Sequence, residues 1–213
     1  MKRIPALYAV ADAAFGDPVD ISERLFRSGV RFLQVRNKRA KSGELLQQTV
    51  RILKAAPKGA GVMVNDRADI ALISGAAGVH LGQADLPPSA GRSMLGPARI
   101  VGVSTHDAIQ ASAAAGEPVD YIAVGPVFET ATKKDHAPVL GLDGLAEICR
   151  QVVLPVVAIG GIRLENLDEV FAAGACSVAV ISDLIGSERI EARAEEFLNR
   201  LAGISGTETE FRA

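Results

Sequence analysis

The chain has 213 residues, of which 48% are hydrophobic and 23% are charged, so it can build one domain with a substantial core. Its 23 lysines and arginines against 25 acidic residues give a formal charge of -2, which excludes the broad basic surface that nucleic-acid and membrane-surface proteins use. Any recognition of phosphate must therefore come from a local site.

Short, continuously apolar runs rich in Val and Ile recur along the whole chain. In order they are PALYAV (5–10), VRFLQV (30–35), GVMVN (61–65), GVHLG (78–82), RIVGVS (99–104), VDYIAVG (119–125), PVVAIGG (155–161) and SVAVIS (177–182). Runs that are apolar throughout, rather than alternating, are typical of strands buried on both faces of a parallel sheet.

Segments of helical length separate these runs. They cover residues 19–29, 42–59, 67–75, 87–96, 106–116, 142–151, 163–174 and 187–203. Gly29 and Gly174 stand just past the last apolar position of their segments, where helices commonly end. Eight strand–helix units predict an α/β fold, a (β/α)₈ TIM barrel forming a single domain over residues 1–204. The polar end, residues 205–213, is expected to be a disordered tail.

Other interpretations of the chain are weaker. A doubly wound open sheet usually has fewer strands, and no G-x-G-x-x-G motif follows the first run. The first residues imitate a signal peptide, but Pro5 and Asp12 interrupt the apolar stretch, so we favour a first strand. Cys149 and Cys176 have apolar neighbours and indicate neither a disulfide framework nor a zinc site, which fits a cytoplasmic protein. No apolar run is long enough to cross a membrane.

Polar side chains follow the predicted strands, at the end of the barrel where catalytic groups collect. In strand order they are Gln34, Arg36 and Lys38; Asn65 and Asp66; Gln83 and Asp85; Ser104 and His106; Thr130, Thr132, Lys133 and Lys134; Gly160 and Gly161; and Ser182. Any one of them could be an ordinary solvated loop residue. Groups able to hold phosphate or metal at seven successive strand ends indicate instead a binding site at this rim.

The acidic and basic residues of this rim each have two interpretations. Asp66 and Asp85 could cap helices, or together could bind Mg²⁺, which usually takes one or two carboxylates and completes its shell with substrate phosphates. Arg36, Lys38 and Lys133 could be solvated cations or could bind anions. Arg36 follows a buried run directly, which favours the second interpretation for this residue.

The sequence AIGGI, followed by AVIS, resembles the phosphate site that barrels often build after their seventh and eighth strands. A tight turn alone could also require these glycines. His80, inside a predicted strand, is interpreted as a hydrogen-bonded core histidine. There is no nucleophile elbow and no evident acid–base dyad. A rim rich in cations and poor in bases suits the departure of an anionic leaving group, in which electrostatics and positioning carry most of the catalysis.

With these residues assembled, the chain resembles the thiamine phosphate synthase (thiamin-phosphate pyrophosphorylase) family from about Leu7 to Leu184. The motifs that carry the resemblance are QVRNK, VNDRADIAL, GVHLGQADLP, GVSTH, DYIAVGPVFETATKK, AIGGI and AVIS. Single motifs such as AIGGI occur in many barrels, but the set in this order is specific. QVRNK carries Val35 and Asn37 where Leu and an acidic residue are common, and neither departure changes a binding group.

The resemblance implies a transferase of thiamine biosynthesis that joins two phosphorylated heterocycles. 4-Amino-5-hydroxymethyl-2-methylpyrimidine diphosphate would lose pyrophosphate, and a (carboxy)hydroxyethylthiazole phosphate would accept its methylene carbon, giving thiamine monophosphate. The implied pyrimidine diphosphate ligands are Gln34, Arg36, Lys38, Asn65, Ser104 and Lys133, with Arg36, Lys38, Ser104 and Lys133 as the catalytic set. Those implied for the thiazole phosphate are Thr130, Thr132, Gly161, Ile181 and Ser182, and those for Mg²⁺ are Asp66 and Asp85.

The resemblance further implies that the loop 125–138 closes over both substrates. No nucleic-acid or membrane partner is expected, and homo-oligomerisation is left open. Two alternatives stand beside the synthase. A related thiazole tautomerase, an isomerase on the same barrel, would not need the diphosphate ligands. A non-catalytic phosphate-binding barrel would bind without turnover.

Overall fold

The structure, a computed structural model, describes residues 3–130, 132 and 137–204. Lys133 and the predicted tail 205–213 lie outside these residues. The strands are β1 (Leu7–Asp12), β2 (Phe32–Arg36), β3 (Gly61–Asn65), β4 (Gly78–Leu81), β5 (Ile100–Thr105), β6 (Tyr121–Val124), β7 (Val156–Ile159) and β8 (Ser177–Val180). The helices are α1 (Pro18–Arg27), α2 (Ser42–Ala55), α3 (Ala68–Ser74), α4 (Pro88–Leu95), α5 (Ala108–Ala115), α6 (Gly141–Gln151), α7 (Leu167–Ala172, after the 3₁₀ turn Leu164–Asn166), α8 (Ser182–Ile185) and α9 (Ile190–Ala202).

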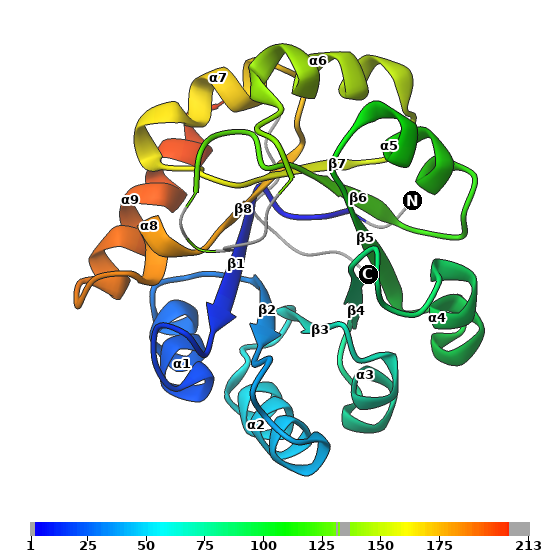
Figure 1. Cartoon of the computed structure of the whole chain (residues 1–213). Helices are drawn as coiled ribbons and strands as arrows, with labels where there is room; N and C mark the ends of the chain where they lie inside the picture. The colour runs from blue at the N-terminus through cyan, green and yellow to red at the C-terminus, as the bar shows by residue number, and fades with distance from the viewer. Residues whose placement is uncertain (1–2, 131, 133–136, 205–213) are drawn as a thin grey trace.

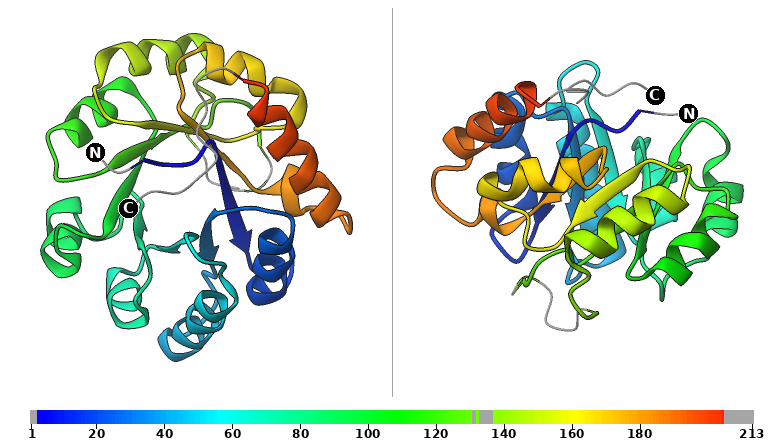
Figure 2. Two further views of the ribbon diagram at one scale, coloured as in Figure 1. Left: turned by 180° about the vertical axis from the view of Figure 1, so that it is seen from behind. Right: turned by 90° about the horizontal axis from the view of Figure 1, so that it is seen from above.

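The strands form a closed barrel in the order β1 to β8, and every neighbouring pair is parallel. The ring closes between β1 and β8, where Leu7 is in register with Val178. The helices lie on the outside of the ring, as Figure 1 and the two views of Figure 2 show. The predicted (β/α)₈ barrel is therefore confirmed, and the open-sheet alternative is wrong. The apolar start of the chain is the strand β1, as predicted.

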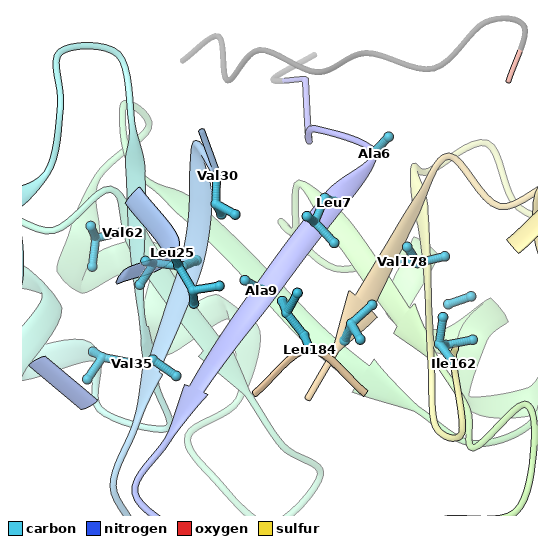
Figure 3. Packing of buried hydrophobic residues seen from close by; sticks show 14 of the residues in the cluster. Ala6, Leu7, Ala9, Leu25, Val30, Val35, Val62, Ile162, Val178 and Leu184 are labelled. Atoms are coloured by element: carbon cyan, nitrogen blue, oxygen red, sulfur yellow. The ribbon is translucent and has the colours of Figure 1, made fainter. Parts of the chain in front are cut away.

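Two apolar layers stabilise the barrel, because successive side chains of a strand point to opposite faces. The outer layer lies between strands and helices; Leu7 and Ala9 of β1 and Leu25 of α1 belong to it (Figure 3). The inner layer fills the barrel and includes Tyr8 and Phe32. Both layers consist of side chains that are almost fully buried. Burial of each large apolar side chain stabilises the fold by roughly 1.5–3 kcal/mol. The inner layer is the floor on which the site stands.

Helix ends follow the signals in the sequence. The Asp17 carboxylate accepts a hydrogen bond from Val19 N at 3.0 Å at the start of α1, and the helix ends at Arg27, ahead of Gly29 with φ 97°.

Both cysteines are free, as predicted. Among the described residues no helix combines the length and the apolar character that a membrane span requires.

Candidate active site

A cavity of about 430 Å³ opens at the carboxyl ends of the strands. Twelve of the thirteen residues that the sequence singled out for binding or catalysis line it: Gln34, Arg36, Lys38, Asn65, Asp66, Asp85, Ser104, Thr130, Thr132, Gly161, Ile181 and Ser182. The thirteenth, Lys133, lies outside the described residues, so its position stays a prediction. A second hollow, of about 530 Å³ beside α2, contains none of them. The barrel therefore brings the predicted residues of seven strands to one place.

Arg36 forms the cationic side of the cavity together with Lys38. Arg36 ends β2 in register with Asp12 of β1, and the Asp12 carboxylate pairs with Nη1 of its guanidinium. Asp12 is only 3% exposed and also accepts a hydrogen bond from Ala14 N at 2.9 Å. Within the described residues the Asp12 carboxylate is the sole side-chain partner of this guanidinium. Its remaining N–H groups are thus held at the cavity and can donate to an anion.

Asp66 and Asp85 lie close together at the ends of β3 and β4. Lys38 Nζ is 3.1 Å from Asp66 Oδ2, and Asp85 Oδ2 accepts a hydrogen bond from Gly82 N at 2.7 Å. Burial raises the pKa of Asp85, and the facing carboxyl of Asp66 raises it further, while Lys38 opposes both effects. A cation bound beside Asp85 would offset the unfavourable effect of burial and of Asp66 on its negative charge.

The backbone at Asp66 is unusual. Its φ of 62° makes it the only residue other than glycine with positive φ in the part of the chain that the structure describes. Arg67 N donates to Asn65 O at 2.8 Å across it, a three-residue turn that is rare and strained. Arg67 occupies the N-cap position of α3 and Pro87 that of α4, neither with a side-chain cap hydrogen bond, so Asp66 and Asp85 cap neither helix. The helix-cap interpretation of both residues is wrong.

The glycine turn follows β7, on the opposite side of the barrel from β3 and β4, whose ends carry the acidic pair. Gly160 and Gly161 follow β7 with φ of 96° and 66°. A Cβ on Gly160 would lie 2.5 Å from Pro126 Cα, because the segment after β6 is hydrogen-bonded along the end of β7, with Val127 N donating to Ile159 O at 2.9 Å. Both glycines are therefore required by the close packing. Both glycines also line the cavity, so the tight turn is compatible with the predicted phosphate site, which stays a prediction.

A chain of buried polar side chains forms the floor of the cavity. Gln34 Nε2 donates to the Tyr8 hydroxyl at 2.8 Å, and that hydroxyl is 3.0 Å from the hydroxyl of Tyr121. Nδ1 of His80 is 2.8 Å from the Tyr121 hydroxyl, and Nε2 is 2.8 Å from Ser104 Oγ. His80 is thus the hydrogen-bonded core histidine that was predicted. Tyr8 and Tyr121 were not among the residues predicted from the sequence. The signal that could have found them is a hydroxyl-bearing side chain at an inward-facing position of an otherwise apolar strand.

We expect His80 to make the fold sensitive to acid. Burial lowers its pKa from 6.5 to about 4. At pH values between these two, His80 is therefore protonated in the unfolded chain and neutral in the folded chain. The stabilising contribution is complete above pH 6.5 and is lost as the pH falls toward 4. We predict that the free energy of unfolding drops by about 2–3 kcal/mol from this group between pH 7 and pH 4.5. Urea titrations should show a smaller drop for His80→Gln; equal drops would contradict it.

Comparison with known proteins decides between the barrels that could carry such a site. The sequence profile described as thiamine monophosphate synthase matches residues 7–184, most of the chain. The chain belongs to the thiamine monophosphate synthase family. It is 42% identical over 206 residues to a thiamine-phosphate synthase of Koribacter versatilis, covering 93% of this chain and 97% of that one. With the enzyme of the same name from Anaeromyxobacter dehalogenans it shares 44% identity over 192 residues, 90% of this chain and 86% of that one.

Solved structures agree with this assignment. The thiamine phosphate pyrophosphorylase from Pyrococcus furiosus superposes with a TM-score of 0.87 at 32% identity, covering 94% of this chain and 96% of that one. The predicted family and enzyme type are therefore confirmed. As a member of the thiamine monophosphate synthase family, the chain is a transferase of thiamine biosynthesis that acts on small phosphorylated substrates. Its cytoplasmic location stays a prediction, and its oligomeric state stays open.

Proposed function

We propose that the chain couples 4-amino-5-hydroxymethyl-2-methylpyrimidine diphosphate with a (carboxy)hydroxyethylthiazole phosphate, releasing pyrophosphate and forming thiamine monophosphate. The observation that carries the proposal is that two groups of predicted anion-binding residues line one cavity. Arg36, Lys38 and the acidic pair line one side, and Gly161 and Ser182 line the other. A diphosphate and a monophosphate can thus be bound together, with their rings between them.

The pyrimidine diphosphate is proposed to bind at the first of these sites. Gln34, Asn65 and Ser104 line this side of the cavity with the cations. The bond between the methylene carbon and the diphosphate oxygen breaks first, and its electron pair leaves with the oxygen. The electron-rich aminopyrimidine stabilises the cation that remains. Arg36 and Lys38 stabilise the charge that develops on the departing pyrophosphate, which is where preorganised donors contribute most.

Asp66 and Asp85 are proposed to hold Mg²⁺. In the described part of the chain no cluster of three or more acidic, His or Cys side chains is present. A facing pair of carboxylates beside a diphosphate site suits Mg²⁺, which keeps several waters and uses substrate phosphates as ligands. Burial and then the facing carboxyl of Asp66 raise the pKa of Asp85, and a bound cation would oppose both effects. The ion would supply positive charge to the leaving diphosphate.

The thiazole phosphate is proposed to bind across the cavity. Backbone N–H groups around Gly161 and the side chains of Ser182, Thr130 and Thr132 can donate to its phosphate. The ring nitrogen attacks the methylene carbon with its lone pair, so no base is needed to remove a proton. This accounts for a site without an acid–base dyad. A carboxylated thiazole would additionally lose CO₂ after the new bond forms.

A product assay tests the function directly. Purified protein, Mg²⁺ and both substrates should give thiamine monophosphate and pyrophosphate in equal amounts. A tautomerase-like isomerase would convert the thiazole alone and would not consume the diphosphate. A non-catalytic barrel would bind either compound without turnover. Absence of thiamine monophosphate with both substrates present would reject the proposed reaction.

Gly161→Ala should selectively weaken the thiazole phosphate. An added Cβ would lie 2.6 Å from Glu129 O and from Phe128 Cβ, and φ of 66° is strained for alanine, so the turn must move. We expect KM for the thiazole phosphate to rise at least about tenfold, the effect of losing one hydrogen bond to a charged group. The KM of the pyrimidine diphosphate should stay within twofold or so. Steady-state kinetics with each substrate varied in turn measures both, and an equal rise in both constants would contradict the assignment.

A further inference from the structure

Four hydrogen bonds link five residues into one line beneath the cavity, from Gln34 on β2 to Ser104 on β5. Tyr8 of β1, Tyr121 of β6 and His80 of β4 are the intermediate members. Only the ends of the line, Gln34 and Ser104, were predicted to contact substrate. The three intermediate residues also line the cavity or its floor, yet no step of the proposed reaction uses them.

The line has one proton order that satisfies every member. The amide nitrogen of Gln34 can only donate, so the Tyr8 oxygen accepts from it and the Tyr8 hydroxyl is directed onward to Tyr121. Tyr121 then donates to Nδ1 of His80, and Nε2–H of His80 donates to Ser104 Oγ. In the reverse order the Tyr8 proton would meet a nitrogen that cannot accept it, which would leave a buried donor unpaired.

The charge states agree with this order. Burial raises the pKa of both tyrosine hydroxyls well above their usual value, so both keep their protons. The Tyr121 hydroxyl, which accepts from Tyr8, has Nδ1 of His80 as its other side-chain partner, so Nδ1 accepts the Tyr121 proton and the imidazole is neutral with its one N–H at Nε2. A neutral imidazole with an acceptor at Nδ1 is what the order requires.

The backbone makes room for the line at Gly102. A Cβ at Gly102 would lie 2.1 Å from Tyr121 Cζ, because Tyr121 is in register with Gly102 on the neighbouring strand and its ring lies over that glycine. The Tyr121 ring stacks on His80 with centroids 5.6 Å apart and an interplanar angle of 20°. Gly102 is also in register with His80 on its other side. The strand therefore lacks a side chain where the line passes.

We propose that Tyr8, Tyr121 and His80 are positioning residues that fix the Ser104 hydroxyl as a donor into the cavity. Because Ser104 Oγ accepts from His80, its own proton is directed toward bound substrate, where an anionic oxygen or a ring nitrogen can accept it. This deepens the proposed function and rests on it for the identity of the acceptor, the pyrimidine diphosphate. With the order reversed, the Ser104 hydroxyl would donate its hydrogen bond to His80, and only its lone pairs would face an anionic substrate.

The tautomer of His80 tests the proton order without any assay of activity. Long-range ¹H–¹⁵N correlation spectra of the wild-type protein at pH 7 should show His80 protonated at Nε2 and unprotonated at Nδ1. A His80→Asn variant assigns the signals. Tyr121→Phe should shift the Nδ1 resonance, since it removes the donor but keeps the ring. A wild-type His80 protonated at Nδ1 overturns the proposal, whatever reaction the protein catalyses.

A double-mutant cycle tests whether the line acts through Ser104. Tyr121→Phe should lower kcat/KM for the pyrimidine diphosphate by about 10-fold to 100-fold, the worth of one hydrogen bond to a charged group. In a Ser104→Ala background the same change should have little further effect, because the two residues act as a unit. Thr49→Val is the matched control, since Thr49 is a buried hydroxyl bonded to Leu45 O at 2.7 Å in α2, and it should leave the kinetics unchanged.

The outcomes separate the two proposals. Equal losses from Tyr121→Phe with and without the Ser104 hydroxyl would show a general structural effect and would overturn the positioning role. If Tyr121→Phe does not fold, Tyr8→Phe interrupts the same line one bond earlier and takes its place in the cycle. If the wild-type protein makes no thiamine monophosphate, the proposed function fails, while the His80 tautomer still decides the proton order.

Discussion

Arg36→Ala should lower turnover by about 10²–10³, or roughly 3–4 kcal/mol of transition-state stabilisation, the usual cost of removing one donor to a developing anion. The guanidinium is held by the buried Asp12 carboxylate and keeps its other N–H groups for the leaving pyrophosphate. Arg36→Lys keeps the charge but not the planar fork, so we expect an intermediate loss. Single-turnover kinetics at saturating substrate measures the effect on the chemical step.

This substitution should also destabilise the fold, and the two effects must be separated. Asp12 is 3% exposed and would lose the partner of its buried charge, which costs about 3 kcal/mol or more. Arg92→Ala is a matched control, because Arg92 makes a similar half-buried pair with Asp120, 2.6 Å apart, away from the cavity. It should lower stability in urea but leave turnover unchanged. Wild-type turnover in Arg36→Ala would refute the role of Arg36.

The contrast between Arg36 and Asp12 illustrates how much the sequence could predict. Runs of Val and Ile, together with glycines after helices, are local signals, and in this chain they sufficed for the barrel and its closure. Topology then brings the ends of successive strands together, so Arg36 could be assigned to the rim. Its partner Asp12 could not be predicted, because the pair depends on the register of β1 against β2. In the sequence, Asp12 only marked the end of an apolar run.

Longer-range contacts were still harder to predict. Tyr8 and Tyr121 are 113 residues apart, and alternation along a strand indicates only that both point inward. Which hydroxyl meets which depends on strand tilt and on the space left by Gly102. The cap interpretation of Asp66 failed for a local reason, since a strained turn comes between β3 and α3 and moves the helix start to Ala68. Asp66 lines the cavity and does not occupy the N-cap position of the helix.

Asp66→Asn tests the proposed metal site while keeping the strained turn at this residue. Asparagine tolerates positive φ about as well as aspartate, so the turn should survive while one negative charge is lost. We expect the Mg²⁺ concentration for half-maximal activity to rise by at least about tenfold, because even residues that only support a metal ligand cost 10–100-fold in affinity. Asp85→Asn should act in the same direction. Titrating the activity of metal-free protein with Mg²⁺ measures both.

Additivity and a neighbouring control decide whether the effect belongs to one ion. If Asp66 and Asp85 bind the same Mg²⁺, the double variant should lose less Mg²⁺ affinity than the product of the two single fold-losses. The second substitution then removes a ligand from a site that is already weakened. Asp69→Asn is the control, since Asp69 lies in the first turn of α3 and is paired with Arg67 at 2.8 Å instead of facing the cavity. Its Mg²⁺ titration should match the wild type. An unchanged titration in Asp66→Asn would remove this residue from the metal site and leave its strained turn without a function.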